Sequence, residues 1–275
     1  MFVKIKTATT LAEVKAALEQ IEEAGSDWFS NLLADDSEIE RWIEKGQISF
    51  VATPVTVAFF RKRYGCQRLY FSNTRREALA EDLRLCLPEI SGKIITSVLD
   101  RNNQNASIKD LLRQVGFSHY ALLKRVVKIN EPKPLEDISV EYATLGDLPR
   151  IEEILQRYFD PLLDHWPDKD EIVAAIEKKR ILVARCPEDQ EVVAIDSFER
   201  KGKTVWGRYW ASIEEFRSDI PYGAILADQY MTINSDARKF IGWVENNNHF
   251  AVRMNRAIGL NFDGTEEEVF ITSVG

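Results

Sequence analysis

The first half of the chain alternates between stretches with a helical period and stretches with a strand period. Apolar residues repeat at helical spacing over residues 11–21, and Gly25 would end this helix. Thr10 and Glu13 form a capping box, in which Glu13 would reach back to the amide of Thr10. Further helices are expected over residues 37–45, 74–85 and 105–116, and strands over 48–52, 55–60, 67–71, 93–99 and 120–129.

The second half repeats the alternation. Asp147 can cap a helix that carries Ile151, Ile154 and Leu155 on one face. The alternating run from Thr204 to Ile213 predicts a strand that leads through a turn into a helix. Strands are expected over 138–143, 181–184, 192–198, 204–213, 240–244 and 267–273, and helices over 147–158, 169–178, 224–233 and 248–259.

Glu131-Pro-Lys-Pro134 is the best internal boundary. Two prolines exclude a helix and disfavour a paired central strand, so a linker is expected. The sequence therefore predicts a domain over residues 1–130, a linker over 131–137 and a second domain over 138–275.

The two domains share an internal repeat. Asn105 and Gly116-Phe117 match Asn248 and Gly259-Leu260, both at an offset of 143 residues (248 − 105). Each copy follows a short apolar strand and precedes a long one. This shared order predicts two tandem copies of one fold.

Composition excludes several classes of protein. The chain has 275 residues, 45% of them apolar, and a net charge of −8 with a pI near 5.2. An acidic chain gives no sign of binding nucleic acid. Three scattered cysteines fit a reducing compartment, and no stretch predicts a membrane span, so a cytoplasmic protein of open oligomeric state is expected.

The second half contains Asn248, Ala251, Asn255 and Gly259-Leu260 at regular spacing, preceded by a turn over residues 217–224. This spacing resembles the motif Asn-x-x-Ala-x-x-x-Tyr-x-x-x-Gly-Phe of the GNAT superfamily of acyl-CoA-dependent N-acyltransferases. The turn resembles the phosphate-binding turn of that family. The resemblance implies an α+β fold of two GNAT-like domains, each a mixed, mostly antiparallel sheet flanked by helices, with the first domain degenerate.

The resemblance also implies acetyl-CoA, or another acyl-CoA, as cosubstrate. A helix N-terminus offers unpaired amides to a diphosphate, and a free strand end pairs with the pantetheine amides. Gly223 would allow close approach of the backbone, and Arg217 would add a charged contact. The expected cofactor-binding residues are Trp210, Ser212, Ile213, Arg217, Ser218, Tyr222, Gly223, Ala224 and Asn248.

Catalysis would need a base for the substrate amine and an acid for the leaving thiolate. The candidate bases are Asp196 and either Glu214 or Glu215; Asp196 lies either on a wet face of the sheet or in a cleft with a raised pKa. Asn255 replaces the family's usual tyrosine acid, and its amide could only hydrogen-bond the sulfur. Pro221 lacks an N–H for the phosphate.

These features leave more than one function open. The first is an N-acyltransferase acting on a small-molecule or peptide amine. The second is a catalytically inactive GNAT-fold binding or regulatory protein, which the altered turn and Asn255 favour. A transferase using aminoacyl-tRNA is disfavoured by the acidic charge. The three histidines, which are far apart in sequence, show no metal-ligand spacing.

Overall fold

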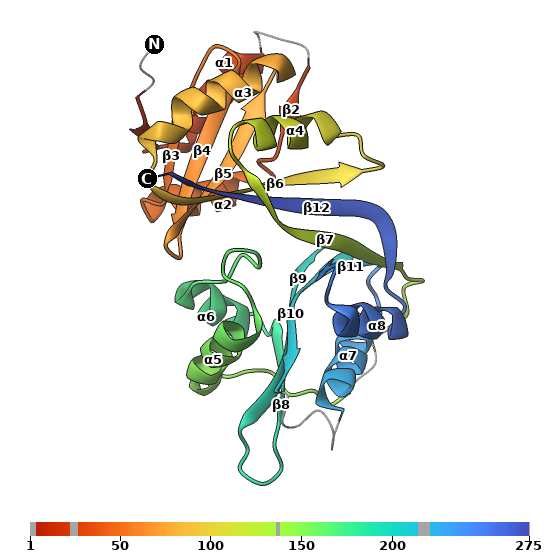
Figure 1. Cartoon of the computed structure of the whole chain (residues 1–275). Coiled ribbons are helices and arrows are strands. Elements are labelled where there is room, and N and C mark those ends of the chain that lie inside the picture. Colours follow the sequence, from red (N-terminus) through yellow and green to blue (C-terminus); the bar gives the residue numbers. More distant parts are fainter. Residues whose placement is uncertain (1–3, 23–26, 136–137, 214–220, 275) are drawn as a thin grey trace. The chain divides into compact units, whose positions relative to one another are not determined.

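The computed structural model describes residues 4–22, 27–135, 138–213 and 221–274. The chain forms two compact units (Figure 1). Unit 1 comprises Met1–Leu122 together with Thr265–Gly275, and unit 2 comprises Leu123–Gly264. Each unit is a mixed sheet flanked by helices, so the α+β class expected from the sequence is confirmed.

The sheet of unit 1 has the strand order β1-β3-β4-β5-β6-β12, with β2 beside β5. Its pairs are antiparallel except β5 with β6, which is parallel. The strands are β1 (Lys6–Thr7), β2 (Phe29–Ser30), β3 (Ile48–Ala52), β4 (Thr56–Arg63), β5 (Cys66–Asn73), β6 (Gly92–Arg101) and the end of β12 (Asn261–Val274).

Helices cover both faces of this sheet because successive strand residues point to opposite sides. Phe59 packs in one core with α1 (Leu11–Glu22) and α2 (Asp36–Glu44), through residues such as Val14 and Trp42. Phe60 packs in the other core with α3 (Arg76–Cys86) and α4 (Ala106–Gln114).

The sheet of unit 2 has the order β7-β11-β10-β9-β8. Figure 1 shows α5 and α6 on one side of its strands and α7 and α8 on the other. The strands are β7 (Ser118–Ile129), β8 (Ile181–Arg185), β9 (Val192–Lys201), β10 (Thr204–Ser212) and β11 (Lys239–Glu245). The helices are α5 (Leu148–Tyr158), α6 (Lys169–Glu177), α7 (Tyr222–Ile233) and α8 (His249–Ala257).

The internal repeat extends to the hydrogen bonds that end α4 and α8. Gly116 and Gly259 both have positive φ, 96° and 88°, as a left-handed residue after a helix requires. The next amide in each copy bonds back into the helix, Phe117 to the Leu112 carbonyl at 3.1 Å and Leu260 to the Asn255 carbonyl at 2.9 Å.

The two repeats exchange their last strands. β7, which follows the first repeat, pairs with β11 from Lys239–Ile129 to Glu245–Leu123. β12, which follows the second repeat, pairs with β6 from Thr265–Arg101 to Val274–Gly92. The compact units therefore divide differently from the expected domains 1–130 and 138–275, because a proline-rich linker marks a break along the chain but not which strands pair.

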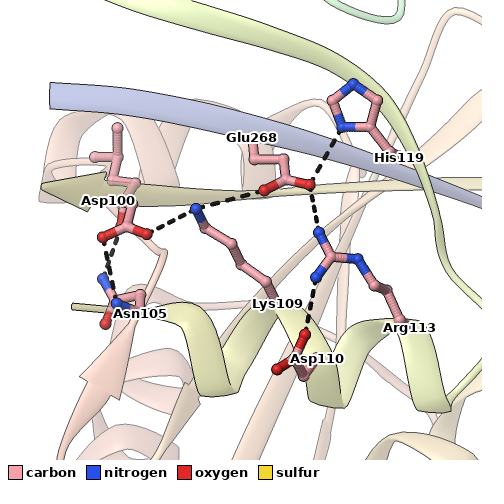
Figure 2. Close-up of polar contacts among 8 residues, drawn as sticks. Asp100, Asn105, Lys109, Asp110, Arg113, His119 and Glu268 are labelled. Carbon is pink, nitrogen blue, oxygen red and sulfur yellow. Dashed lines mark hydrogen bonds and ion pairs between the residues drawn. The ribbon is translucent and has the colours of Figure 1, made fainter. Parts of the chain in front are cut away.

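Buried charges hold β12 to unit 1. Figure 2 shows Glu268 of β12 facing Lys109 and Arg113 of α4 and His119 of β7. One carboxylate oxygen lies 2.7 Å from Arg113 and 3.2 Å from His119 Nδ1, and the other lies 3.4 Å from Lys109 Nζ. Lys109 also pairs with Asp100 of β6 at 2.7 Å. Because Glu268 is only 9% exposed, these partners compensate for its lost hydration.

Three local expectations need correction. Residues 138–143 form no strand but one bridge, Tyr142 to Leu182. Glu13 accepts hydrogen bonds from the amide and hydroxyl of Thr9, one residue before the expected partner. Asp147 does not cap α5; its carboxylate binds Arg185 and the amide of Thr144, which keeps its pKa low despite burial.

Candidate functional site

Two parallel strands of unit 2 part from each other. β10 pairs with β11 only at Thr204–Trp206 with Lys239–Ile241. Beyond that point β10 continues beside β9 to Ser212, and β11 continues beside β7 to Glu245. The strand leading to Ile213 is therefore separated from β11 from Gly242 onwards. Parted strands leave backbone donors and acceptors facing the gap between them.

A bulge lies on β10 where the strands part. The register against β9 shifts between Gly207 and Tyr209, which re-aims the side chains that follow. A Cβ on Gly207 would lie 3.8 Å from the hydroxyl of Tyr230 on α7. Tyr209 donates to the carbonyls of Asp164 and His165 at 2.9 and 2.8 Å, in the loop between α5 and α6.

The first turn of α7 lies against the end of β10. Trp210 Nε1 donates to the carbonyl of Gly223 at 3.1 Å. A Cβ on Gly223 would lie 3.6 Å from Trp210 Nε1 and 3.7 Å from Ser212 Oγ, which is ordinary contact. The helix begins at Tyr222, two residues earlier than expected, with Pro221 at its N-cap. Strand, turn and helix thus bring Trp210, Ser212 and Gly223 together.

The other expected binding residues are distributed as follows. Tyr222 and Ile213 are buried in the core of unit 2, whereas Ala224 is exposed. Asn248 caps α8 by accepting the amide of Ala251 at 3.0 Å. Glu214, Arg217 and Ser218 lie outside the residues that the structure describes.

Asn255 lies beside β11 just past the separation. Its Oδ1 would be 3.8 Å from a Cβ on Gly242. Its Nδ2 donates to the carbonyl of Ala251 within the same helix at 2.9 Å. One of the two N–H groups of this amide is therefore engaged within the helix.

Asp196 lies on β9 directly opposite Trp210 of β10 and Leu182 of β8. Opposed residues of antiparallel strands point to the same face. Because the Trp210 indole reaches α7, Asp196 also lies under α7. It is 4% exposed, which rules out a wet face of the sheet. No hydrogen bond or ion pair joins its carboxyl group to another described residue.

Burial raises the pKa of Asp196 well above its usual value. Burial also raises the pKa of Tyr230, with a further contribution from the charge of Asp196. Tyr230 packs between Phe198, in a tilted contact, and Phe240, in an edge-to-face contact, with ring centroids 5.6 Å apart in each pair. These surroundings disfavour the charged forms of Asp196 and Tyr230.

Gly207, Tyr209 and Tyr230 are not among the site residues predicted from the sequence. Gly207 interrupts an otherwise bulky run, Val205-Trp206-Gly207-Arg208-Tyr209, and such an isolated glycine in a strand is a signal for a bulge. Only the bulge and the packing of α7 bring Tyr209 and Tyr230 to the site.

No group of His, Cys, Asp or Glu within the described ranges is arranged to hold a metal ion. No described helix is both long and apolar enough to span a membrane.

Comparisons with solved structures identify the fold. A GCN5-related N-acetyltransferase from Sphaerobacter thermophilus is similar over 98% of this chain and 95% of its own, with a TM-score of 0.63 at 15% identity. A GNAT-family acetyltransferase from Colwellia psychrerythraea is similar over 99% of this chain and 100% of its own (TM-score 0.56, 12% identity).

A tandem GNAT protein from the clavulanic acid biosynthesis pathway is similar over 99% of both chains, with a TM-score of 0.64 at 8% identity. No family model and no curated protein matches the sequence. The chain therefore has the fold of the GNAT acetyltransferases. More particularly, it has the tandem form of that fold, as expected from the internal repeat.

Proposed function

We propose that this protein is an acyl-CoA-dependent N-acyltransferase with its acyl-donor site in unit 2. The separation of β10 from β11 beyond Trp206 and Ile241 carries the proposal. An extended, amide-bearing chain can pair with a strand edge freed in this way, as an added strand does. Acetyl-CoA, with its pantetheine arm, has that chemistry. The fold shared with GNAT acetyltransferases supports the same donor.

The N-terminus of α7 would hold the diphosphate of the donor. Gly223 in its first turn carries no side chain, and a helix N-terminus offers unpaired amides to an anion. Arg217 and Ser218 are proposed phosphate contacts, Trp210, Ser212 and Ile213 provide the strand edge, and Asn248 flanks the acyl end. The bound donor would supply a thioester whose carbonyl an amine can attack.

Burial distinguishes the two proposed bases, Asp196 and Glu214. Asp196, enclosed beneath α7 and favoured in its protonated form, is poorly placed to take a proton from an incoming amine. Glu214, next to the end of β10, is the better proposed base. Asn255 holds the Ala251 carbonyl with one N–H and could offer the other to the thiolate, but a carboxamide cannot supply the proton that a leaving thiolate takes up.

Titration calorimetry with acetyl-CoA tests the donor site. We expect binding by the natural protein and at least roughly tenfold weaker binding by Gly223→Leu, because its side chain would press on Trp210 and Ser212. Gly223→Ala is the matched control, since a Cβ fits at ordinary contact distance. No binding at high micromolar acetyl-CoA by the natural protein would refute the proposal.

Asn255, whose carboxamide cannot give up a proton to the leaving thiolate, favours a second candidate, a binding or regulatory protein that retains the donor site without catalysis. A thiol-release assay with acetyl-CoA and pooled small-molecule and peptide amines distinguishes the two. Release of coenzyme A that depends on an amine supports the transferase. Binding without release, with every amine in the pool, supports the regulatory protein.

A further inference from the structure

Unit 1 contains the same separation of parallel strands as unit 2. β5 pairs with β6 only at Cys66–Arg68 with Lys93–Ile95. β5 then continues beside β4 to Asn73, and β6 continues beside β12 to Arg101. Backbone groups along the freed edges need partners, because an unpaired buried amide or carbonyl is costly.

A segment of unit 1 itself supplies these partners along β5. We call residues Asp27–Asn31 the inserted segment. Phe29 and Ser30 of this segment form β2, which is antiparallel to β5, with Phe29 opposite Asn73 and Ser30 opposite Ser72. The amide of Asp27 donates to the Thr74 carbonyl at 3.2 Å, and the amide of Asn31 donates to the Phe71 carbonyl at 3.1 Å. Since β4 occupies the other edge of β5 throughout, the inserted segment lies on the edge that β6 leaves.

The side chain of Asn31 connects the two parted strands. Its Oδ1 accepts the amide of Phe71 on β5 at 2.6 Å. Its Nδ2 donates to Thr96 Oγ1 at 3.0 Å and to the Ser97 carbonyl at 2.9 Å, both on β6. Thr96 Oγ1 in turn donates to the Leu69 carbonyl of β5 at 2.9 Å. The carboxamide of Asn31 thus makes hydrogen bonds with both strands across the gap.

Removing the inserted segment would leave several buried groups unpaired. Thr96 and Phe71 are both fully buried, and the ring of Phe29 packs 5.5 Å from that of Phe71. A ligand would have to replace these hydrogen bonds and this ring contact together. Competition by a solution ligand is therefore unfavourable.

We propose that the inserted segment permanently occupies, in unit 1, the place that the pantetheine arm of an acyl-CoA takes in unit 2. In unit 2, no strand of described residues lies beside β10 in the position that β2 takes beside β5. The chain consequently binds one acyl donor. The identity of the ligand rests on the proposed function, but the occupation of the gap in unit 1 does not.

Amide hydrogen exchange, followed residue by residue by NMR, tests the occupation of the gap. In the natural protein the amide of Phe71 should exchange slowly, although it faces away from β4. In Asn31→Ala it should exchange roughly tenfold faster or more, because its acceptor is lost. Asn261→Ala, an exposed asparagine of unit 2, is the matched control and should leave Phe71 unchanged.

Rapid exchange of Phe71 in the natural protein would overturn the proposal without any variant, so a poorly folded Asn31→Ala does not prevent a decision. Calorimetry with acetyl-CoA supplies a second readout. One site per chain supports the proposal, and two sites per chain overturn it. An absence of binding refutes the proposed function alone, and the exchange of Phe71 then decides the present inference.

Discussion

At the scale of single residues, Asp196 is the most unusual group of unit 2. A carboxyl group that is 4% exposed with no partner among the described residues is costly to ionise. The sequence marked Asp196 as interesting because it interrupts an apolar strand. The structure shows that α7 covers it, which turns a candidate base into a group that folding favours in its protonated form.

We expect Asp196 to make the folded protein less stable as pH rises. Its pKa is raised in the folded state, so its contribution is fully present below the unfolded pKa of about 3.9 and is lost as pH rises towards the folded pKa. The Asp196→Asn variant has a neutral amide in place of the carboxyl group and takes up no proton there. Over that window the stability of the variant should improve relative to the natural protein by up to about 1.4 kcal/mol per pH unit.

Urea unfolding from pH 4 to pH 8 measures this difference. Asp228→Asn, on the exposed side of α7, is the control and should follow the natural protein at every pH. Parallel curves for Asp196→Asn and the natural protein would show that Asp196 does not take up a proton on folding.

At the scale of elements, the attachment of β12 to unit 1 depends on a few buried charges. The carboxylate of Glu268 contacts three cationic or hydrogen-bonding side chains, two from α4 and one from β7 (Figure 2). Isolated surface ion pairs stabilise little, but a buried charge that loses its partners is strongly destabilising. β12 is therefore held by more than its ladder of backbone hydrogen bonds.

Glu268→Gln should lower the free energy of unfolding by about 2–4 kcal/mol, because Lys109 and Arg113 would keep their charges beside a neutral amide. Asp110→Asn is the control. It removes another partner of Arg113, at 2.9 Å, but Asp110 is exposed, so a loss of at most about 0.5 kcal/mol is expected. Chemical unfolding followed by circular dichroism measures both; equal effects would place Glu268 among ordinary surface pairs.

At the scale of the whole molecule, the exchange of β7 and β12 makes each unit depend on the other half of the sequence. Unit 2 takes β7 from the first half for its pairing with β11, and unit 1 takes β12 from the second half for its pairing with β6. A cut in the linker would leave each fragment with one long strand out of place and one exposed strand edge.

Fragments 1–130 and 138–275 should therefore fold poorly when expressed separately and recover structure when expressed together. Solubility, circular dichroism and co-purification through a tag on one fragment measure this. A cut in the hairpin between β9 and β10, at Gly202, is a control for breaking the chain without separating paired strands from their units. Two independently folded fragments from the linker cut would contradict the exchange.

The sequence alone was sufficient for the local elements and the duplication. Capping residues, apolar periods and left-handed glycines act over a few neighbouring residues, so the bounds of α4 and α8 and the repeat at Gly116 and Gly259 could be predicted from it. It also placed Trp210 and Gly223 in one strand–turn–helix unit, because those residues are close along the chain.

Only the tertiary structure decided which strands pair, which gap is filled and which polar groups are buried. Asn31 and Thr96 lie 65 positions apart, and no local pattern links them. Asp196 became a buried acid because α7 folds over β9, and the last strand joined unit 1 because β6 offered it an edge. Strand pairing and burial are set by contacts between distant residues, to which hydrophobic periodicity is insensitive.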